Sequence, residues 1–356
     1  MKRIVLTGGG TAGHVTPHFA LAPYLKEKGW DIYYIGTHEG IERQLVGERF
    51  PYYPISAGKL RRYFDFKNLS DPFRVVKGVV DAYGHLRRIK PAVVFSKGGF
   101  VAVPVTVAAW LLRIPVILHE SDLTPGLANK LSLPFAQKLC VTFPESVHHL
   151  KGRAGQKVVV TGTPIRAELF QGSRQKGLKM CGFSPGVPVL LVMGGSLGSA
   201  VLNRTIRENL QEITGNYQII HLCGRDNLDP NVSHPHYFQL EYANEELPHL
   251  LAAADFVLSR AGANAIFELA ALAKPNILVP LSKQASRGDQ ILNAASFEKQ
   301  GFSVVVQEEE LTGRVLQEKL ALLAREKQRF VEAMESSPIK NGTGSILRLI
   351  EEVARY

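Results

Sequence analysis

The 356-residue chain exceeds one ordinary α/β domain and predicts two domains, each large enough to bury its own core. Apolar residues make up 45%, and no segment has the roughly 20 uninterrupted apolar residues of a membrane span. The net charge of +10 lies in the first half: residues 1–160 hold 22 Lys and Arg against 11 Asp and Glu, leaving 20 against 21 elsewhere. This asymmetry predicts an anionic partner for that half, whether nucleic acid, a phosphate-bearing substrate or acidic lipid.

Two further features of the composition narrow the class of protein. The three cysteines lie far apart and form no C-x-x-C pair, which indicates reduced thiols and excludes a disulfide framework or a zinc motif. The opening segment MKRIVLTGGG turns to glycine after a short apolar run, so no signal-peptide core is predicted there. We therefore expect a cytoplasmic protein.

The first half begins with a strand, a glycine loop and a helix. Residues 3–7 (RIVLT) predict a buried strand, and a helix is predicted from Pro17 to Lys28, where Gly29 ends it. Further strands are expected at residues 31–36, 92–96 and 115–120, with helical stretches between them. Strands that alternate with helices predict a parallel, doubly wound sheet.

The second half repeats this order. Residues 187–193 predict a strand, 194–199 a glycine loop and 200–210 a helix. The later strands and helices are predicted at residues 217–222, 255–259, 263–273, 275–280, 289–300 and 302–306. Gly162 and Pro164 interrupt the pattern and indicate a hinge. We predict domains at 1–163 and 164–340, chemistry in the cleft between them, and a helix at 341–356 that packs back on the first domain.

The first glycine loop satisfies G-x-G-x-x-G at Gly8, Gly10 and Gly13, directly after a strand, which is typical of phosphate binding. A dinucleotide oxidoreductase would also need an acidic residue at the end of the second strand, and that strand ends Tyr34-Ile35-Gly36-Thr37. His14 instead places an imidazole beside the expected phosphate. A second loop, Lys97-Gly98-Gly99-Phe100, follows another strand of the same sheet. Gly9, Gly10, Gly98 and Gly99 together suit a diphosphate, although the second loop alone is as typical of a tight turn.

Five loops occur in the order typical of one family: residues 9–15 (GGTAGHV), 98–101 (GGFV), 119–122 (HESD), 194–198 (GGSLG) and 260–263 (RAGA). With them, nearly the whole chain resembles the MurG family of N-acetylglucosaminyltransferases, in glycosyltransferase family 28. The resemblance implies a GT-B fold of two Rossmann-like domains. It also implies an inverting hexosyltransferase without metal or other cofactor. The implied donor is UDP-N-acetylglucosamine, and the implied acceptor is the muramoyl C4 hydroxyl of undecaprenyl-diphospho-N-acetylmuramoyl-pentapeptide.

The resemblance also implies roles for single residues. Glu268 would hold the ribose hydroxyls, and Arg166 would face the donor diphosphate. The full set of donor-binding residues that it implies is Thr11, Ala12, Gly13, Asp122, Arg166, Ser196, Asn244, Gly262, Ala263, Asn264, Glu268 and Gln290. This chain departs from the commoner family pattern at Ser121-Asp122, Leu197 and Asp289. An ionised Asp122 accepts hydrogen bonds but cannot donate one as an Asn amide does.

Inversion requires a group that takes the proton of the acceptor hydroxyl while other groups stabilise the leaving diphosphate. We expect His14 to be this base or to orient the acceptor diphosphate, with Glu120 as the rival base. No D-x-D motif is present, so we expect helix ends and Arg166 to stabilise the charge of the leaving diphosphate.

The segment from Lys59 to Lys90 carries nine basic and three acidic residues. Within it, apolar positions 73, 76, 79, 80 and 83 recur at helical spacing, which is more typical of a core-facing helix than of a membrane surface. The charge nevertheless suits anionic lipid, with contacts at Arg61, Arg62, Lys67, Phe73, Arg74 and Lys77. We expect peripheral binding at the cytoplasmic face of the cell membrane.

Three other functions remain open at this point. A UDP-sugar transferase that modifies a diacylglycerol-type lipid would share the fold and the donor. A UDP-N-acetylglucosamine 2-epimerase also has two such domains. A nucleic-acid-binding protein has little support, because the basic residues are not interleaved with a base-stacking aromatic platform.

Overall fold

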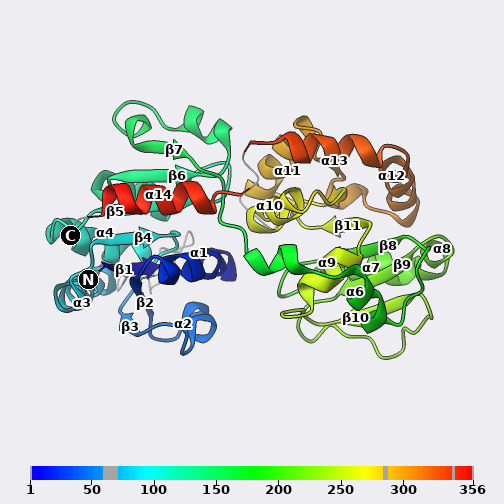
Figure 1. Ribbon diagram of the computed structural model, residues 1–356, viewed down its shortest axis with the longest axis horizontal. Coiled ribbons are helices and arrows are strands. Elements are labelled where there is room, and N and C mark those ends of the chain that lie inside the picture. The colour runs from blue at the N-terminus through cyan, green and yellow to red at the C-terminus, as the bar shows by residue number, and fades with distance from the viewer. Residues whose placement is uncertain (1, 59–70, 284–287, 339–340, 355–356) are drawn as a thin grey trace. The chain divides into compact units, whose positions relative to one another are not determined.

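The computed structural model describes residues 2–58, 71–283, 288–338 and 341–354. The chain divides into two compact units (Figure 1). The first unit comprises Met1–Ile165 and Asn341–Tyr356, and the second comprises Arg166–Lys340. The first unit thus extends to Ile165, slightly beyond the predicted boundary at 163, and it includes the C-terminal segment.

The first unit contains a seven-stranded parallel sheet in the order β3-β2-β1-β4-β5-β6-β7. Its strands are β1 (Lys2–Thr7), β2 (Trp30–Thr37), β3 (Tyr52–Ile55), β4 (Val93–Ser96), β5 (Val116–Glu120), β6 (Lys138–Val141) and β7 (Val158–Val160). Its α-helices are α1 (Thr16–Glu27), α2 (Ile41–Val46), α3 (Asp71–Ile89), α4 (Ala102–Leu111), α5 (Leu127–Ser132) and α14 (Thr343–Val353). Short 3₁₀ turns lie at η1 (Ala12–His14), η3 (Leu133–Phe135), η4 (Pro144–His149) and η5 (Gly155–Lys157).

Both faces of this sheet are buried, which explains why its strands are continuous apolar runs. Ile4 and Leu6 of β1 belong to a core cluster completed by α1 and α14, whereas Val5 belongs to the cluster completed by α3 and α4. Side chains alternate across a strand, so successive β1 residues supply opposite faces. Two hydrophobic layers therefore hold β1 at the centre of the unit.

The last helix belongs to the first unit although the second unit precedes it in the chain (red in Figure 1). Glu351 of α14 pairs with Lys2 at 3.1 Å and accepts a hydrogen bond from the Trp30 indole at 2.9 Å. The N–H of Gly342 donates to the carbonyl of Thr163 at 2.8 Å. The first two contacts fasten α14 to the beginnings of β1 and β2, and the third fastens Gly342, just before α14, to the segment after β7.

The second unit contains a six-stranded parallel sheet in the order β10-β9-β8-β11-β12-β13. Its strands are β8 (Val189–Met193), β9 (Gln218–Leu222), β10 (Tyr237–Leu240), β11 (Phe256–Ser259), β12 (Asn276–Leu278) and β13 (Ser303–Val305). Its helices are α6 (Arg174–Cys181), α7 (Ala200–Glu208), α8 (Leu210–Thr214), α9 (Leu247–Ala253), α10 (Ala263–Ala271), α11 (Asp289–Lys299), α12 (Gly313–Arg325) and α13 (Lys327–Ser336). Two 3₁₀ turns, η6 (Ala167–Gln171) and η7 (Glu308–Glu310), complete it.

Each sheet has one position where the chain reverses its direction of growth across the sheet. In the first unit this position lies between β1 and β4, and in the second it lies between β8 and β11. Loops that leave two such strands diverge and open a crevice at the carboxyl ends of the strands, where ligands of this fold class bind. All the predicted glycine loops follow one of these four strands.

Candidate active site

The two glycine loops of the first unit touch each other. A Cβ on Gly99 would lie 2.1 Å from the carbonyl oxygen of Gly9, and one on Gly10 would lie 2.9 Å from the Phe100 ring. Gly10, Gly98 and Gly99 all have positive φ, at +87°, +85° and +80°, where glycine is favoured. The structure thus brings the four glycines of the predicted diphosphate site together. No side chain fits where their backbones meet.

Two buried side chains, those of Tyr34 and Glu42, form hydrogen bonds with the backbone of the first glycine loop. The Tyr34 hydroxyl donates to the carbonyl of Gly8 at 2.8 Å. The carboxylate of Glu42, which is 0% exposed, accepts from the N–H of Gly10 at 3.1 Å and from the N–H of Thr37 at 3.1 Å. The N–H of Gly10 is therefore bonded to protein. Glu42 was not predicted from the sequence, because a charged residue in a short helix is usually exposed to solvent.

His14 lies at the end of the first loop, in η1, and is partly exposed. Its Nδ1 is 3.0 Å from the carbonyl oxygen of Gly9 and 3.1 Å from the hydroxyl of Thr11. A carbonyl only accepts, so Nδ1 carries the proton and Nε2 of the neutral ring carries the lone pair. This tautomer is the one that a general base requires.

Glu120, the predicted rival base, is engaged by its own loop. Its side chain is buried, and its Oε1 accepts from the N–H of Asp122 at 3.1 Å. Its Oε2 accepts from the N–H of Gly126 at 2.8 Å and from the Asn129 amide at 2.9 Å. Burial, followed by the nearby charge of Asp122, raises the pKa of Glu120. These three donors make Glu120 an organiser of the loop after β5.

Arg166 and Glu268 of the second unit bind each other. Two bonds join them, from Nε to Oε1 at 2.9 Å and from Nη2 to Oε2 at 3.1 Å. Their side chains are only 23% and 18% exposed, respectively. Arg166 directly precedes η6, and Glu268 lies in α10, so the pair links the start of this unit to the helix that begins with the predicted donor residues Ala263 and Asn264.

The loops after β8 and β11 also meet. Ser199 caps α7, and its hydroxyl accepts from Arg260 at 2.7 Å. Arg260 is 8% exposed and pairs with Glu308. Gly262, Ala263 and Asn264 follow it at the beginning of α10. Sequence analysis quoted Arg260 only as part of a motif; its position at the end of β11 was the signal that it serves the loop junction.

The remaining predicted donor residues have different surroundings. Ser196 and Leu197 are exposed in the loop after β8. Gln290 accepts from the N–H of Leu281 at 3.1 Å, which holds α11 to the end of β12. Asn244 is exposed in the loop after β10, where its own N–H donates to Glu246 at 3.0 Å. Thr11, Ala12 and Gly13 lie in the first unit, in or beside η1.

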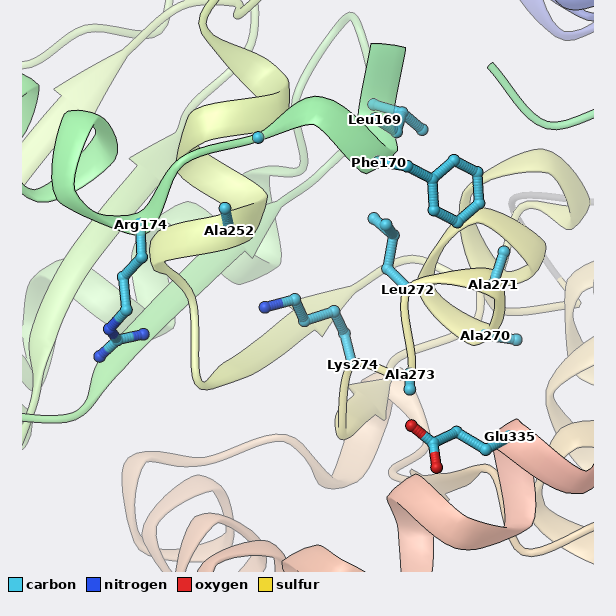
Figure 2. Close-up of a pocket in the computed structure, with 11 residues that line it drawn as sticks. Leu169, Phe170, Arg174, Ala252, Ala270, Ala271, Leu272, Ala273, Lys274 and Glu335 are labelled. Atoms are coloured by element: carbon cyan, nitrogen blue, oxygen red, sulfur yellow. The ribbon is translucent and has the colours of Figure 1, made fainter. Parts of the chain in front are cut away.

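A cavity of about 540 Å³ lies elsewhere in the second unit (Figure 2). Its walls come from η6, α6, α9, the end of α10 and α13; Figure 2 shows Lys274 after α10 and Glu335 on α13. The Lys274 ammonium donates to the carbonyl of Ala254 at 2.8 Å, and burial lowers its pKa to about 8. None of the predicted site residues lines this cavity.

The predicted membrane residues fall into two groups. Arg61, Arg62 and Lys67 lie outside the described residues. Phe73, Arg74 and Lys77 are exposed at the start of α3, and Phe73 is 80% exposed. Neighbouring Val76 and Val80 are also exposed, at 63% and 66%. Val79 packs against the core beside Ala82 and Leu86, so the preferred interpretation of the stripe as core-facing was wrong only for its exposed members.

The described part of the chain offers neither a cluster of metal ligands nor a membrane-spanning helix. No group of three or more His, Cys, Asp or Glu residues there could hold a metal ion. No helix there is long and apolar enough to cross a membrane.

Comparisons with known proteins cover both units. The model of the glycosyltransferase family 28 N-terminal domain matches residues 4–141, and that of the family 28 C-terminal domain matches residues 189–349. The chain is 57% identical over 357 residues to the "UDP-N-acetylglucosamine--N-acetylmuramyl-(pentapeptide) pyrophosphoryl-undecaprenol N-acetylglucosamine transferase" of Clostridium botulinum (strain Loch Maree / Type A3), with 100% of both chains covered. The Clostridium tetani protein of the same name is 55% identical over 353 residues, which are 99% of this chain and 98% of that one.

A solved structure gives the same picture of the fold. The crystal structure of Acinetobacter baumannii MurG superimposes with a TM-score of 0.75 at 24% identity, covering 99% of this chain and 100% of that one. The predicted GT-B fold with two parallel-sheet domains is confirmed.

Proposed function

The chain belongs to glycosyltransferase family 28, and we infer that it transfers N-acetylglucosamine from UDP-N-acetylglucosamine to a lipid-linked muramoyl-pentapeptide acceptor. The observation that carries this function is the likeness to the named clostridial transferases along the full length of both units. A transferase with another acceptor, or an epimerase, would share the fold but has no such support. The activity belongs to peptidoglycan precursor synthesis.

The substrates are assigned to the two units by their loops. The acceptor diphosphate binds at the touching glycine loops of the first unit, Gly9-Gly10 and Gly98-Gly99. The donor binds at the loops of the second unit, with the uridine ribose at Glu268 and the diphosphate toward the first turn of α7. A helix N-terminus carries partial positive charge and unpaired N–H groups, which favour phosphate.

His14 acts as the general base. The acceptor hydroxyl attacks the anomeric carbon from the face opposite the diphosphate, the bond from that carbon to the diphosphate oxygen breaks, and UDP leaves with the electron pair. The hydroxyl proton passes to Nε2, because the bond from Nδ1 to Gly9 fixes the tautomer that exposes a lone pair there. The bonds of Glu120 support this role for His14 rather than for the carboxylate.

The function is tested with purified protein, labelled UDP-N-acetylglucosamine and a lipid-linked muramoyl-pentapeptide. We expect label to move into the lipid product only when this acceptor is present, and transfer to persist in EDTA because we propose a metal-independent reaction. Diacylglycerol in place of the acceptor tests the lipid-transferase alternative. Conversion to UDP-N-acetylmannosamine without lipid would identify an epimerase, and transfer to diacylglycerol alone would overturn the proposed acceptor.

Membrane contact is proposed for the exposed stripe of α3, which consists of Phe73, Val76 and Val80 flanked by Arg74 and Lys77. Apolar side chains beside cations suit the surface of an anionic bilayer, where each cation contributes about 1 kcal/mol. The site of this contact is the cytoplasmic face of the cell membrane, where a UDP-sugar donor is available.

The double variant Arg74→Ser/Lys77→Ser is expected to bind phosphatidylglycerol-containing vesicles about 10- to 30-fold more weakly than the wild type, because it lacks two cations that face the lipid. Vesicle co-sedimentation at low and high salt measures this, and the wild-type affinity should fall with salt. Lys151→Ser/Arg153→Ser removes the same charge from an exposed turn elsewhere in the unit. If both double variants lost vesicle affinity equally, the effect would come from net charge alone, and the proposed surface would be contradicted.

A further inference from the structure

Lys97 is a fully buried lysine at the start of the second glycine loop. It follows β4 directly, and its backbone N–H donates to the carbonyl of Thr7 at 2.9 Å, at the end of β1. The residue is only 2% exposed. Its side chain thus lies beneath the junction of the two glycine loops, and neither the predicted substrate contacts nor the proposed base includes it.

The ammonium of Lys97 holds the segment that follows β5. Its Nζ is 2.7 Å from Nδ1 of His119 and 2.6 Å from the hydroxyl oxygen of Ser121. Nε2 of His119 lies 3.0 Å from the carbonyl oxygen of Gly162, so Nε2 carries the ring proton and Nδ1 accepts from Lys97. Burial lowers the pKa of His119, in agreement with a neutral ring. Lys97 is therefore the donor in both hydrogen bonds.

The same segment carries two carboxylates, Glu120 and Asp122, whose charges attract the ammonium and oppose the effect of burial. Burial nevertheless lowers the pKa of Lys97 to about 7. The titratable groups that interact with it come from β5 and the following loop, from β6 and from α1; they are His119, Glu120, Asp122, Cys140 and His18.

We propose that Lys97 is a positioning residue for the transfer reaction: its ammonium, bonded to His119 and Ser121, fixes the His119–Asp122 segment against the glycine loops and balances the Glu120 and Asp122 carboxylates. This inference rests on the proposed transferase function. A buried ammonium is costly to desolvate, and an apolar side chain of similar length would fill the space without that cost. The cation also attracts the Asp122 carboxylate, an acceptor-only group at a position where the commoner family pattern has Asn.

Asn129 connects the segment held by Lys97 to the rest of the candidate active site. This amide donates to Glu120 at 2.9 Å and lies against Gly98, where a Cβ would meet it at 3.2 Å. Moving the His119–Asp122 segment therefore moves a side chain that supports the second glycine loop. Small displacements of positioned groups cost about 100-fold in rate.

The test compares Lys97→Met with the wild type in the lipid-linked transfer assay. We expect kcat to fall about 10- to 100-fold, while the affinity for UDP stays within about twofold, because the proposed nucleotide loops belong to the other unit. The Lys97 charge and the Glu120 carboxylate attract each other, so loss of the cation raises the pKa of Glu120, and the acid limb of the pH–kcat profile should move to higher pH. Lys157→Met is the matched control, since Lys157 donates to the carbonyls of Leu133 and Pro134 at 3.1 Å in the same unit, outside the site.

Unchanged kcat and an unchanged pH profile in a folded Lys97→Met protein would overturn the proposal. If that variant does not fold, Ser121→Ala decides, because it keeps the ammonium and removes one of its two acceptors. We expect its kcat to fall about 3- to 10-fold, the range of one ordinary hydrogen bond, because the bond to His119 still holds the ammonium. Wild-type kinetics in this variant would also overturn the proposal. Failure of the wild type to transfer sugar to the lipid-linked acceptor would instead contradict the proposed function.

Discussion

Replacing His14 with Ala is expected to lower the rate of sugar transfer by about 10²- to 10⁴-fold, the range that a general base contributes. The bond from Nδ1 to Gly9 sets the tautomer with a basic Nε2, and Ala has no group that takes the acceptor proton. The affinity for UDP should stay within about twofold, because the proposed donor loops lie in the other unit. Initial rates with saturating lipid acceptor and calorimetric titration with UDP measure the two quantities.

His14→Asn distinguishes proton transfer from support of the loop. The Asn side-chain amide can still donate a hydrogen bond toward the carbonyl of Gly9, but it does not accept a proton at neutral pH. A base role predicts that His14→Asn is as slow as His14→Ala. Retention of more than about a tenth of wild-type turnover in either variant would be inconsistent with the base contribution expected of His14.

The second large effect is expected at Arg166. Arg166→Ala should weaken UDP-N-acetylglucosamine binding by about 30-fold, or about 2 kcal/mol, the typical range for a hydrogen-bonded charged group. The guanidinium holds the Glu268 carboxylate through two bonds, and truncation leaves that carboxylate partly buried without this partner. Donor affinity by calorimetry and the free energy of unfolding in urea both report the change.

A double-mutant cycle tests whether Arg166 and Glu268 contribute through their pairing. Arg166→Ala/Glu268→Ala should cost little more than either single replacement, because each single change already removes the paired geometry. Arg314→Ala/Glu318→Ala is the matched control in the same unit, since that pair is 3.7 Å apart and its side chains are 86% and 62% exposed. Exposed pairs contribute about 0–1 kcal/mol. If the losses from the two single replacements simply add in the double variant, Arg166 and Glu268 act independently, and the prediction is contradicted.

Long apolar runs made the two sheets predictable. RIVLT at residues 3–7 and VPVLLVM at 187–193 correspond to β1 and β8, which lie at the centres of their sheets. The short strands β3, β6 and β10 escaped prediction; β3 and β10 lie at sheet edges, where fewer side chains need to be apolar, whereas β6 is an interior strand of only four residues. Pro54 within β3 is tolerated for the same reason, since an edge strand can spare one N–H.

The candidate site was predictable where glycine is required and unpredictable where a charge is buried. Positive φ and backbone contact leave a signature of glycines in the sequence, and Gly10, Gly98 and Gly99 carried it. Glu42 and Lys97 carry no such signature, because their hydrogen-bond partners include residues 22 to 32 positions away in the chain. The stripe on α3 misled in the opposite sense: helical spacing reports a shared face and does not tell whether that face meets protein or solvent.

The position of α14 has a consequence for biosynthesis. A ribosome releases the chain from its N-terminus, so β1, α1 and β2 emerge long before Ile346 and Ile350, which complete their shared core cluster. Until residues 341–354 are made, that face of the nascent first unit lacks its cover, while residues 166–340 can already fold as a unit of their own. Synthesis of α14, rather than emergence of the first 165 residues, therefore sets the moment at which the core of the first unit becomes complete.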